Sequence, residues 1–283
     1  MEVRLAEHAG FCFGVKRAVD MVYAQIEANP GIPIYTYGPI IHNEQVVKEL
    51  EGMGARALKD TEIDSVTKGV MIIRSHGVSK ATEDAIKAAG HTIIDATCPF
   101  VKKIHRTVSE ASENGKHILI VGSEDHPEVQ GIIGWCKNTP CVIEKLEDTD
   151  KIPFAKEEEI CVVSQTTFNL RKFQEIVDYI AKIGYSINVV NTICNATEER
   201  QCSARTLAGE ADCMIVIGDT HSSNSRKLYE ICKIECDNTH FIQTLDDLHL
   251  DLPKSVRLVG ITAGASTPNN IIEEVQNYVR NEF

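Results

Sequence analysis

The chain has 283 residues, of which 43% are hydrophobic and 25% are charged. That composition is ordinary for a folded globular protein and excludes a disordered or collagen-like chain. Acidic residues outnumber basic residues by 41 to 29, giving a formal net charge of −12. Nucleic-acid binders normally carry a basic surplus, so we expect no nucleic-acid partner. Neither a signal-peptide pattern nor an apolar run near the roughly 18 residues of a membrane helix is seen, so we expect a cytoplasmic protein with no membrane partner.

The ten cysteines are the first unusual feature. Structural disulfides are rare in cytosolic proteins, so these thiols are expected to be core residues, metal ligands or catalysts. The sequence has no CxxC pair, which argues against zinc ribbons and thioredoxin-like redox sites. A metal site would therefore have to gather cysteines from distant parts of the chain.

Three segments of the chain share one pattern. In each, an apolar stretch ends in a turn that contains a cysteine, and a helical pattern follows. The three cysteines are Cys12, Cys98 and Cys194. A β-rich run ending in glycine comes next, 24 residues after the cysteine in the second and third segments and 26 residues after it in the first. We predict a threefold internal repeat.

Two further polar positions repeat within each segment. One lies four residues after the glycine, and the other closes the next β-rich run. The first set is His42, His126 and Ser222, and the second set is His76, Thr166 and Ser266. A helical pattern follows each position. The predicted units span 1–97, 98–192 and 193–283, and the last unit ends where the strand before Cys12 would continue the cycle.

Strands that alternate with helices predict an α/β protein with mainly parallel sheets. Ligands of such sheets bind beyond the carboxyl ends of the strands, where all the repeated polar positions fall. We expect a trefoil of three α/β units related by a pseudo-threefold axis. This arrangement would bring Cys12, Cys98 and Cys194 to one central site.

Three thiolates around one centre favour a metal group. Structural zinc usually takes a fourth protein ligand, and no fourth cysteine repeats with the triplet, although a histidine could supply it. A [4Fe–4S] cluster on three cysteines leaves one open iron that can act as a Lewis acid and deliver electrons. The other cysteines are expected in the core, with Cys161 and Cys213 in strands and Cys136, Cys232 and Cys236 on helices.

The polar residues around the cysteines indicate an anionic substrate. Each of them alone could be a simple helix cap, but several helix N-termini directed at one spot form an anion site. Histidines and hydroxyls there suit a phosphate or diphosphate, and no nucleotide-binding glycine motif occurs. The set is His42, His76, His126, Thr166, Ser222, Ser223, Asn224 and Ser266.

Glu128 is the predicted proton donor. It falls in the first helical turn after His126 and Pro127, where a glutamate is often only a partner of the helix dipole. Asp125 is the competing carboxylate. Basic residues after the first two cysteine turns are either a solvated helix face or a docking site for an acidic electron carrier. They are Lys16, Arg17, Lys102, Lys103 and Arg106.

Eight short motifs occur in the order of one known family. They are GFCFGV, the SHG turn at His76, ATCPFV, the HPE of His126 to Glu128, SQTT, TICNAT, SSNS and TAGAS. Together they resemble 4-hydroxy-3-methylbut-2-enyl diphosphate reductase, the last enzyme of the non-mevalonate isoprenoid pathway, from about residue 10 to residue 268. That family is a trefoil around a central iron–sulfur cluster.

The resemblance implies a role for each repeated residue. Cys12, Cys98 and Cys194 would hold one [4Fe–4S] cluster with an open iron for the substrate hydroxyl. The histidines, hydroxyls and Asn224 would bind the diphosphate, with His126 beside them, Glu128 supplying protons and Thr166 steering them. Loss of the hydroxyl as water would give isopentenyl and dimethylallyl diphosphates. Electrons would come from ferredoxin, flavodoxin or a similar donor.

Two other classes of protein remain open on the residues alone. One is an open-iron hydro-lyase acting on carboxylic acids, which would want arginines for carboxylates. The other is a non-enzymatic iron–sulfur sensor or scaffold, which would need neither an anion-binding ring nor Glu128.

Overall fold

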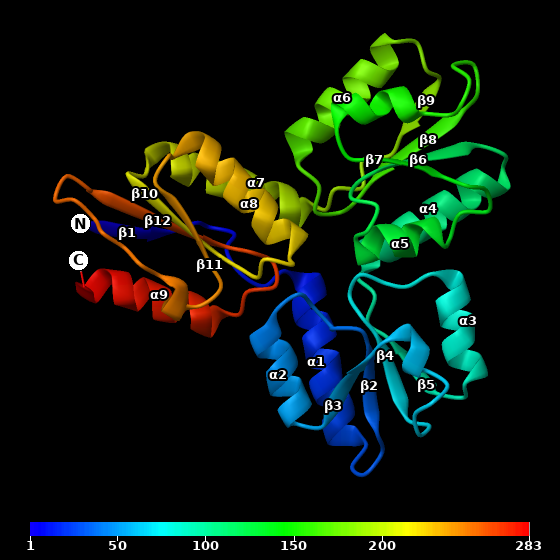
Figure 1. Ribbon diagram of the computed structural model, residues 1–283, viewed down its shortest axis with the longest axis horizontal. Helices are drawn as coiled ribbons and strands as arrows, with labels where there is room; N and C mark the ends of the chain where they lie inside the picture. Colours follow the sequence, from blue (N-terminus) through cyan, green and yellow to red (C-terminus); the bar gives the residue numbers. More distant parts are fainter. Residues whose placement is uncertain (283) are drawn as a thin grey trace. The chain divides into compact units, whose positions relative to one another are not determined.

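The computed structural model describes residues 1–282 and contains three four-stranded sheets, whose strand pairs are all parallel (Figure 1). The chain divides into two compact units. Unit 1 comprises Met1–Lys16, His42–Glu44 and the chain from Cys194 onward, and unit 2 comprises Arg17–Ile41 and Gln45–Ile193. Within residues 1–282, no helix combines the length and the apolar character needed to cross a membrane.

Unit 1 contains one sheet, in which the first strand of the chain pairs with the last. Its strand order is β1 (Glu2–Leu5), β12 (Leu258–Ala263), β10 (Cys213–Ile217) and β11 (Thr239–Ile242). The helices are α7 (Asn195–Glu210), α8 (Ser223–Glu235) and α9 (Asn269–Glu282), with a 3₁₀ turn, η3 (Leu245–Asp247). Figure 1 shows α7 and α8 on one face of the sheet and α9 on the other, so both faces are covered.

Unit 2 contains two sheets. The strand order of one is β3 (Ala55–Leu58), β2 (Ile34–Tyr37), β4 (Val70–Ile73) and β5 (Thr92–Asp95). That of the other is β7 (Cys141–Ile143), β6 (His117–Val121), β8 (Ile160–Ser164) and β9 (Ile187–Val189). The helices and 3₁₀ turns are α1 (Phe13–Ala28), whose first turn belongs to unit 1, α2 (Glu44–Gly52), η1 (Asp60–Glu62), α3 (Lys80–Ala88), α4 (Pro99–Glu113), α5 (Pro127–Ile133), η2 (Leu146–Lys151) and α6 (Leu170–Lys182).

The three sheets have the same internal order, which confirms the predicted repeat of parallel α/β units. In every sheet the two central strands have, at one edge, a short strand that follows a helix, which is β3, β7 or β11. On the other side lies the strand that leads into a cysteine turn, which is β1, β5 or β9. The boundaries at 97 and 192 stay a prediction.

The central strands are apolar because they are covered on both faces. Every residue of β4, β8 and β10 is buried, and their sequences are rich in Ile and Val, which pack well on a pleated surface. In the sheet of β6 and β8, alternate residues face α6 on one side and α4 with α5 on the other. The edge strands β1 and β9 keep exposed positions, as expected where cover is incomplete.

Three details differ from the sequence-based expectations. The short strands β3, β7 and β11 were not predicted, because they have only three or four residues and weak periodicity. Cys136 does not lie on a helix as predicted, because α5 ends at Ile133 and Gly134 is its C-cap. Cys232 lies within α8, whereas Cys236 is the C-cap residue just beyond that helix.

Candidate functional site

The three repeated cysteines all lie in turns between an edge strand and a helix. Cys98 and Cys194 are the N-cap residues of α4 and α7, and Cys12 immediately precedes α1. All three are partly exposed, whereas Cys161, Cys213, Cys232 and Cys236 are buried. All ten cysteines are outside disulfide bonds. Each of the three sulfurs thus lies at the N-terminus of a helix, a position from which a cysteine can serve as a metal ligand.

In unit 1 the Cys12 turn is hydrogen-bonded to the end of the neighbouring strand β12. The Gly10 amide donates to the carbonyl of Ala263 (3.2 Å), and the Cys12 amide donates to the carbonyl of Ala265 (3.3 Å). Ala265 directly precedes Ser266. The candidate metal ligand and the candidate substrate ligand are therefore fixed to each other by main-chain bonds.

Arg200 connects the Cys12 and Cys194 turns within unit 1. The side chain is only 3% exposed and arises from α7, the helix that Cys194 caps. Nη2 donates to the carbonyl of Gly10 (2.7 Å) and Nη1 to that of Ala196 (3.0 Å). Burial lowers the pKa of Arg200, and the negative charges of the Cys12 and Cys194 thiolates act in the opposite direction.

The Cys98 turn in unit 2 is held in the same way. The Cys98 amide donates to the carbonyl of Ser75 (2.9 Å), the residue before His76. Arg17 of α1 donates to the carbonyls of Asp95, Ala96 and Thr97 at 3.2–3.4 Å. Arg17 is thus half-buried and bonded to the main chain, which corrects its interpretation as part of a solvated helix face or a docking site.

Four candidate substrate ligands gather in unit 1 at the start of α8 and the end of β12. Ser222 is the N-cap of α8, and its Oγ accepts from the Ser225 amide (3.3 Å) and lies 3.5 Å from Ser266 Oγ. Asn224 Oδ1 accepts from the Ala265 amide (2.9 Å). Ser222, Ser223, Asn224 and Ser266 are all buried.

The Asn224 amide nitrogen is the clearest sign of a ligand in this group. Its Nδ2 is buried and has no hydrogen-bond partner among residues 1–282. An unpaired buried donor is costly, and a bound anion would satisfy it. The hydroxyls and the helix N-terminus around it provide further positive dipole ends, so the group suits a phosphate. His42 also belongs to unit 1 and is half-buried.

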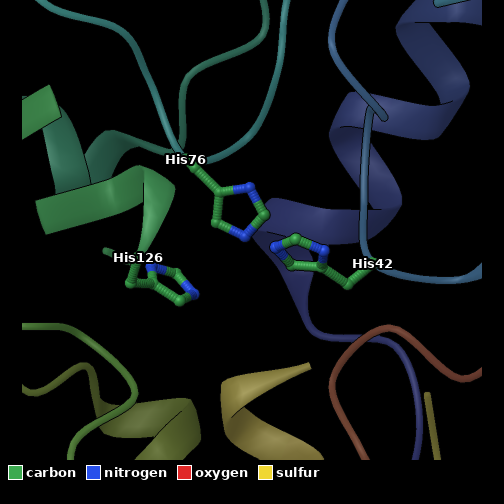
Figure 2. Close-up of side chains that lie close together, drawn as sticks. All are labelled: His42, His76 and His126. Atoms are coloured by element: carbon green, nitrogen blue, oxygen red, sulfur yellow. The ribbon is translucent and has the colours of Figure 1, made fainter. Parts of the chain in front are cut away.

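In unit 2 the structure brings His76 and His126 together. Their rings meet edge to face, with centroids 5.4 Å apart. Figure 2 shows the two side chains next to each other. His126 is the N-cap of α5, and its Nδ1 accepts from the Glu128 amide (3.1 Å). Because Nδ1 accepts, Nε2 carries the proton in the neutral ring and can donate to an anion.

Glu128 is buried and paired with Thr166. Its carboxyl is 2% exposed and accepts from the Thr166 amide at Oε1 (2.6 Å) and from the Thr166 hydroxyl at Oε2 (2.7 Å). Burial raises the pKa of Glu128, and the two bonds from Thr166 oppose that rise. A carboxyl whose pKa is raised by burial holds its proton more tightly than an exposed one, which suits it to act as an acid. The competing carboxylate, Asp125, is exposed.

Sequence reasoning missed the roles of Arg17 and Arg200. Both lie five or six residues after a repeated cysteine. Each donates hydrogen bonds to main-chain carbonyls just before a different repeated cysteine, Cys98 for Arg17 and Cys12 for Arg200. That spacing was the only signal, and it could not show that the side chains turn inward. Ser223 and Asn224 lie in the first turn of α8, where the helical pattern of the sequence begins.

A sequence profile of the LytB protein family matches residues 3–280. The chain belongs to the LytB protein family. A reductase of 4-hydroxy-3-methylbut-2-enyl diphosphate from Clostridioides difficile is 45% identical over 282 residues, covering 99% of this chain and 100% of that one. The enzyme of the same name from Caldanaerobacter subterraneus is 44% identical over 276 residues, covering 97% of this chain and 95% of that one.

Two solved structures have the same fold as this LytB protein. One, of the E-1-hydroxy-2-methyl-but-2-enyl-4-diphosphate reductase from Plasmodium falciparum, has a TM-score of 0.93 at 30% identity and covers 99% of this chain and 88% of that one. The other, of a 4-hydroxy-3-methylbut-2-enyl diphosphate reductase described as the terminal enzyme of the non-mevalonate pathway, has a TM-score of 0.71 at 41% identity. It covers 99% of this chain and 100% of that one.

The donor set of this LytB protein fits an iron–sulfur group. Thiolates are the ligands that such groups prefer, and three partly exposed cysteines at helix N-termini provide them. The buried positive charge of Arg200 faces two of these turns, as an anionic cluster would require. The Cys194 Sγ also lies 3.1 Å from the Thr197 hydroxyl, a neighbour that can orient the ligand.

The Gly10 position gives a test of how tightly the Cys12 turn is fixed. Gly10 has φ +88°, and a Cβ there would lie 2.8 Å from Ile272 Cδ1 and 3.3 Å from Asn269 Oδ1. We expect Gly10→Ala to lower both the thermal midpoint and the iron content of anaerobically purified protein. Gly31→Ala is the control, because Gly31 has φ +81° but no described atom within 4 Å of its Cβ position.

Both variants carry the left-handed backbone cost of roughly 1–2 kcal/mol, so any difference between them measures crowding at the Cys12 turn. Equal iron contents and equal midpoints would contradict the close fit of this turn.

Proposed function

We propose that this protein reductively removes the hydroxyl group of 4-hydroxy-3-methylbut-2-enyl diphosphate to give isopentenyl and dimethylallyl diphosphates. The relatives carry the name of that reductase over nearly the whole chain. The observation in this chain that carries the proposal is the buried Glu128 carboxyl. It lies on α5, the helix that His126 caps, and it is held by two hydrogen bonds from Thr166. A sensor or scaffold has no use for a buried carboxyl held in this way.

The diphosphate is bound by two groups of side chains in this proposal. Unit 1 contributes His42 and the cluster of Ser222, Ser223, Asn224 and Ser266, where the unpaired Asn224 Nδ2 supports an anion. Unit 2 contributes His76 and His126, whose neutral ring can donate from Nε2. Binding energy from the diphosphate, which does not react, positions the reacting end of the substrate.

Glu128 supplies the proton in this proposal. An alcohol oxygen leaves poorly unless it departs as water, so a proton must reach it at the moment of bond cleavage. Thr166 fixes both carboxyl oxygens and so determines the orientation of the acid. His126 lies at the same helix end, where its ring Nδ1 accepts a hydrogen bond from the Glu128 amide and supports that position.

We propose Cys12, Cys98 and Cys194 as the ligands of one [4Fe–4S] cluster with one open iron. When bound, such a cluster supplies electrons and a Lewis acid for the substrate hydroxyl. The remaining seven cysteines are outside this set. Those in β8, β10 and α8 are buried among apolar side chains, as small core residues are.

The electron donor is proposed to be an acidic carrier such as ferredoxin or flavodoxin. Phe100, which is 43% exposed, lies two residues after Cys98 on α4. Lys103 and Arg106 are exposed further along that helix. An apolar contact ringed by positive charge would attract an acidic partner and dock it near a candidate cluster ligand. We also propose a cytoplasmic location, where cysteines outside disulfides are the norm.

A direct test is anaerobic turnover of the allylic diphosphate with dithionite and a mediator as electron source. Formation of both isomeric products would support the proposal. A loaded cluster with no turnover would favour a sensor, and conversion without consumption of reductant would indicate a hydro-lyase.

The ligand assignment predicts a selective loss of iron. We expect Cys98→Ser to lose most of its iron, because serine oxygen is a poor ligand for a cluster that prefers thiolates. Cys202→Ser is the matched control, since Cys202 is exposed and lies at no repeated position. Iron and acid-labile sulfide per chain, measured after anaerobic purification, give the answer. A full iron complement in Cys98→Ser would remove that residue from the ligand set.

The acid assignment predicts a large kinetic effect without loss of the cluster. We expect Glu128→Gln to lower turnover by about 10²-fold or more, the usual effect of losing acid catalysis. Iron content and affinity for the diphosphate should stay near those of the wild type. Glu124→Gln makes the same charge change at an exposed position four residues earlier and should keep normal turnover. Near-normal turnover in Glu128→Gln would exclude Glu128 from the proton step.

The pH dependence of turnover follows from the pKa of Glu128. Because burial raises that pKa, the acid keeps its proton above the ordinary value of 4.5 and loses it as the pH rises through the shifted value. We expect turnover of the wild type to fall on this alkaline side. The folded state also loses stability over the same range, because the carboxylate must then be buried. An identical alkaline decrease in Glu128→Gln would assign it to another group.

A further inference from the structure

Arg200 is a buried cation without a carboxylate partner. It is 3% exposed, and no described carboxylate forms a salt bridge with it. Its two hydrogen bonds go to the main-chain carbonyls of Gly10 and Ala196, which are neutral acceptors. A buried charge is retained at a cost of several kcal/mol unless an anion compensates it. The positive charge of Arg200 therefore favours a further negative group beside it.

The negative charges that act on Arg200 are those of Cys12, Cys194 and Glu199, and the two cysteines are the candidate cluster ligands. Arg200 bonds the main chain two residues before Cys12 and two residues after Cys194. Its Nε is buried and has no hydrogen-bond partner among residues 1–282. A guanidinium presents its donors in a fixed plane, so this remaining N–H is a preorganised donor for a soft anionic acceptor.

We infer that Arg200 is a positioning residue that ties the Cys12 turn to the Cys194 turn and stabilises the reduced form of the iron–sulfur cluster through its fixed positive charge. This inference rests on the function proposed above. Reduction adds one electron and one negative charge to the cluster, and no bond forms or breaks. A neighbouring buried cation favours the more negative state, so it raises the reduction potential.

Two substitutions separate the charge of Arg200 from its hydrogen bonds. Arg200→Lys keeps the positive charge and loses the planar donor group, whereas Arg200→Gln keeps a hydrogen-bonding amide and loses the charge. Arg205→Gln is the matched control, because Arg205 lies on the same helix but pairs with Glu235 (3.3 Å) away from the cysteine turns.

The quantity to measure is the one-electron midpoint potential of the cluster. It is obtained by anaerobic titration with dithionite and mediators, with the reduced cluster detected by electron paramagnetic resonance. We expect Arg200→Gln to shift the reduction equilibrium by at least about tenfold toward the oxidised cluster, which corresponds to 59 mV. Arg200→Lys should recover most of that shift, and Arg205→Gln should match the wild type. Iron retained during exposure to a chelator gives a second reading, in which the same order is expected.

Five outcomes decide the inference. A lower potential in Arg200→Gln with recovery in Arg200→Lys supports it, as does iron loss in the Gln variant alone. Unchanged potentials in both variants, or equal shifts in both, overturn the charge role. A wild-type protein that folds but binds no cluster overturns the proposed function as well, and the wild-type iron count distinguishes that case from a failure of Arg200 alone.

Discussion

The hydrogen bond from a cysteine amide to the loop beside it links the candidate metal ligands to the candidate substrate ligands. It joins Cys98 to Ser75, next to His76, and Cys12 to Ala265, next to Ser266. Each bond lies just past the end of a parallel strand pair, β5 with β4 and β1 with β12. A slip of one residue in that pairing would move the side chains of the Cys98 and Cys12 turns to the opposite face of their sheets. The register of the sheets therefore fixes the chemistry at their carboxyl ends.

The charge distribution explains how an acidic protein can hold anions. The chain has a formal net charge of −12, yet the positions around the cysteines and hydroxyls are locally positive. Arg200 bonds the main chain of the Cys12 turn, and Arg17 donates hydrogen bonds to the main-chain carbonyls before Cys98. The N-terminus of α8 adds the positive end of a helix dipole. Because fields in a low-dielectric interior are local, the overall charge does not weaken this site.

The repeat could be predicted from the sequence because it depends on spacing and turn chemistry. A cysteine in the turn after each of β1, β5 and β9, and a polar residue after each central strand, follow from the alternation of strands and helices. The acid role of Glu128 was proposed from its place after His126 and Pro127 and stays a prediction. The structure shows that Glu128 is buried, and burial raises its pKa. The strands β3, β7 and β11 were not predictable, because their pairing comes from the neighbouring strand and not from their own three or four residues.

The roles of Arg17 and Arg200 could not be predicted for a different reason. An arginine in a polar helix pattern normally points to solvent, and only the tertiary structure turns these two toward main-chain carbonyls. Each arginine follows a repeated cysteine and bonds the main chain before another one. Because this occurs in two of the three repeats, we attribute it to the repeat itself. The structure thus adds one buried and one half-buried arginine to the candidate ligands and hydroxyls that the sequence indicated.

The most direct test of the account is to count iron and sulfide per chain after anaerobic purification and to record the visible spectrum with and without the allylic diphosphate. The account predicts about four irons and four sulfides per chain, the content of one [4Fe–4S] cluster, with a spectrum that changes on addition of the diphosphate. Zinc, or no metal, in a well-folded anaerobic sample would contradict the assignment of Cys12, Cys98 and Cys194 and remove the path for electrons.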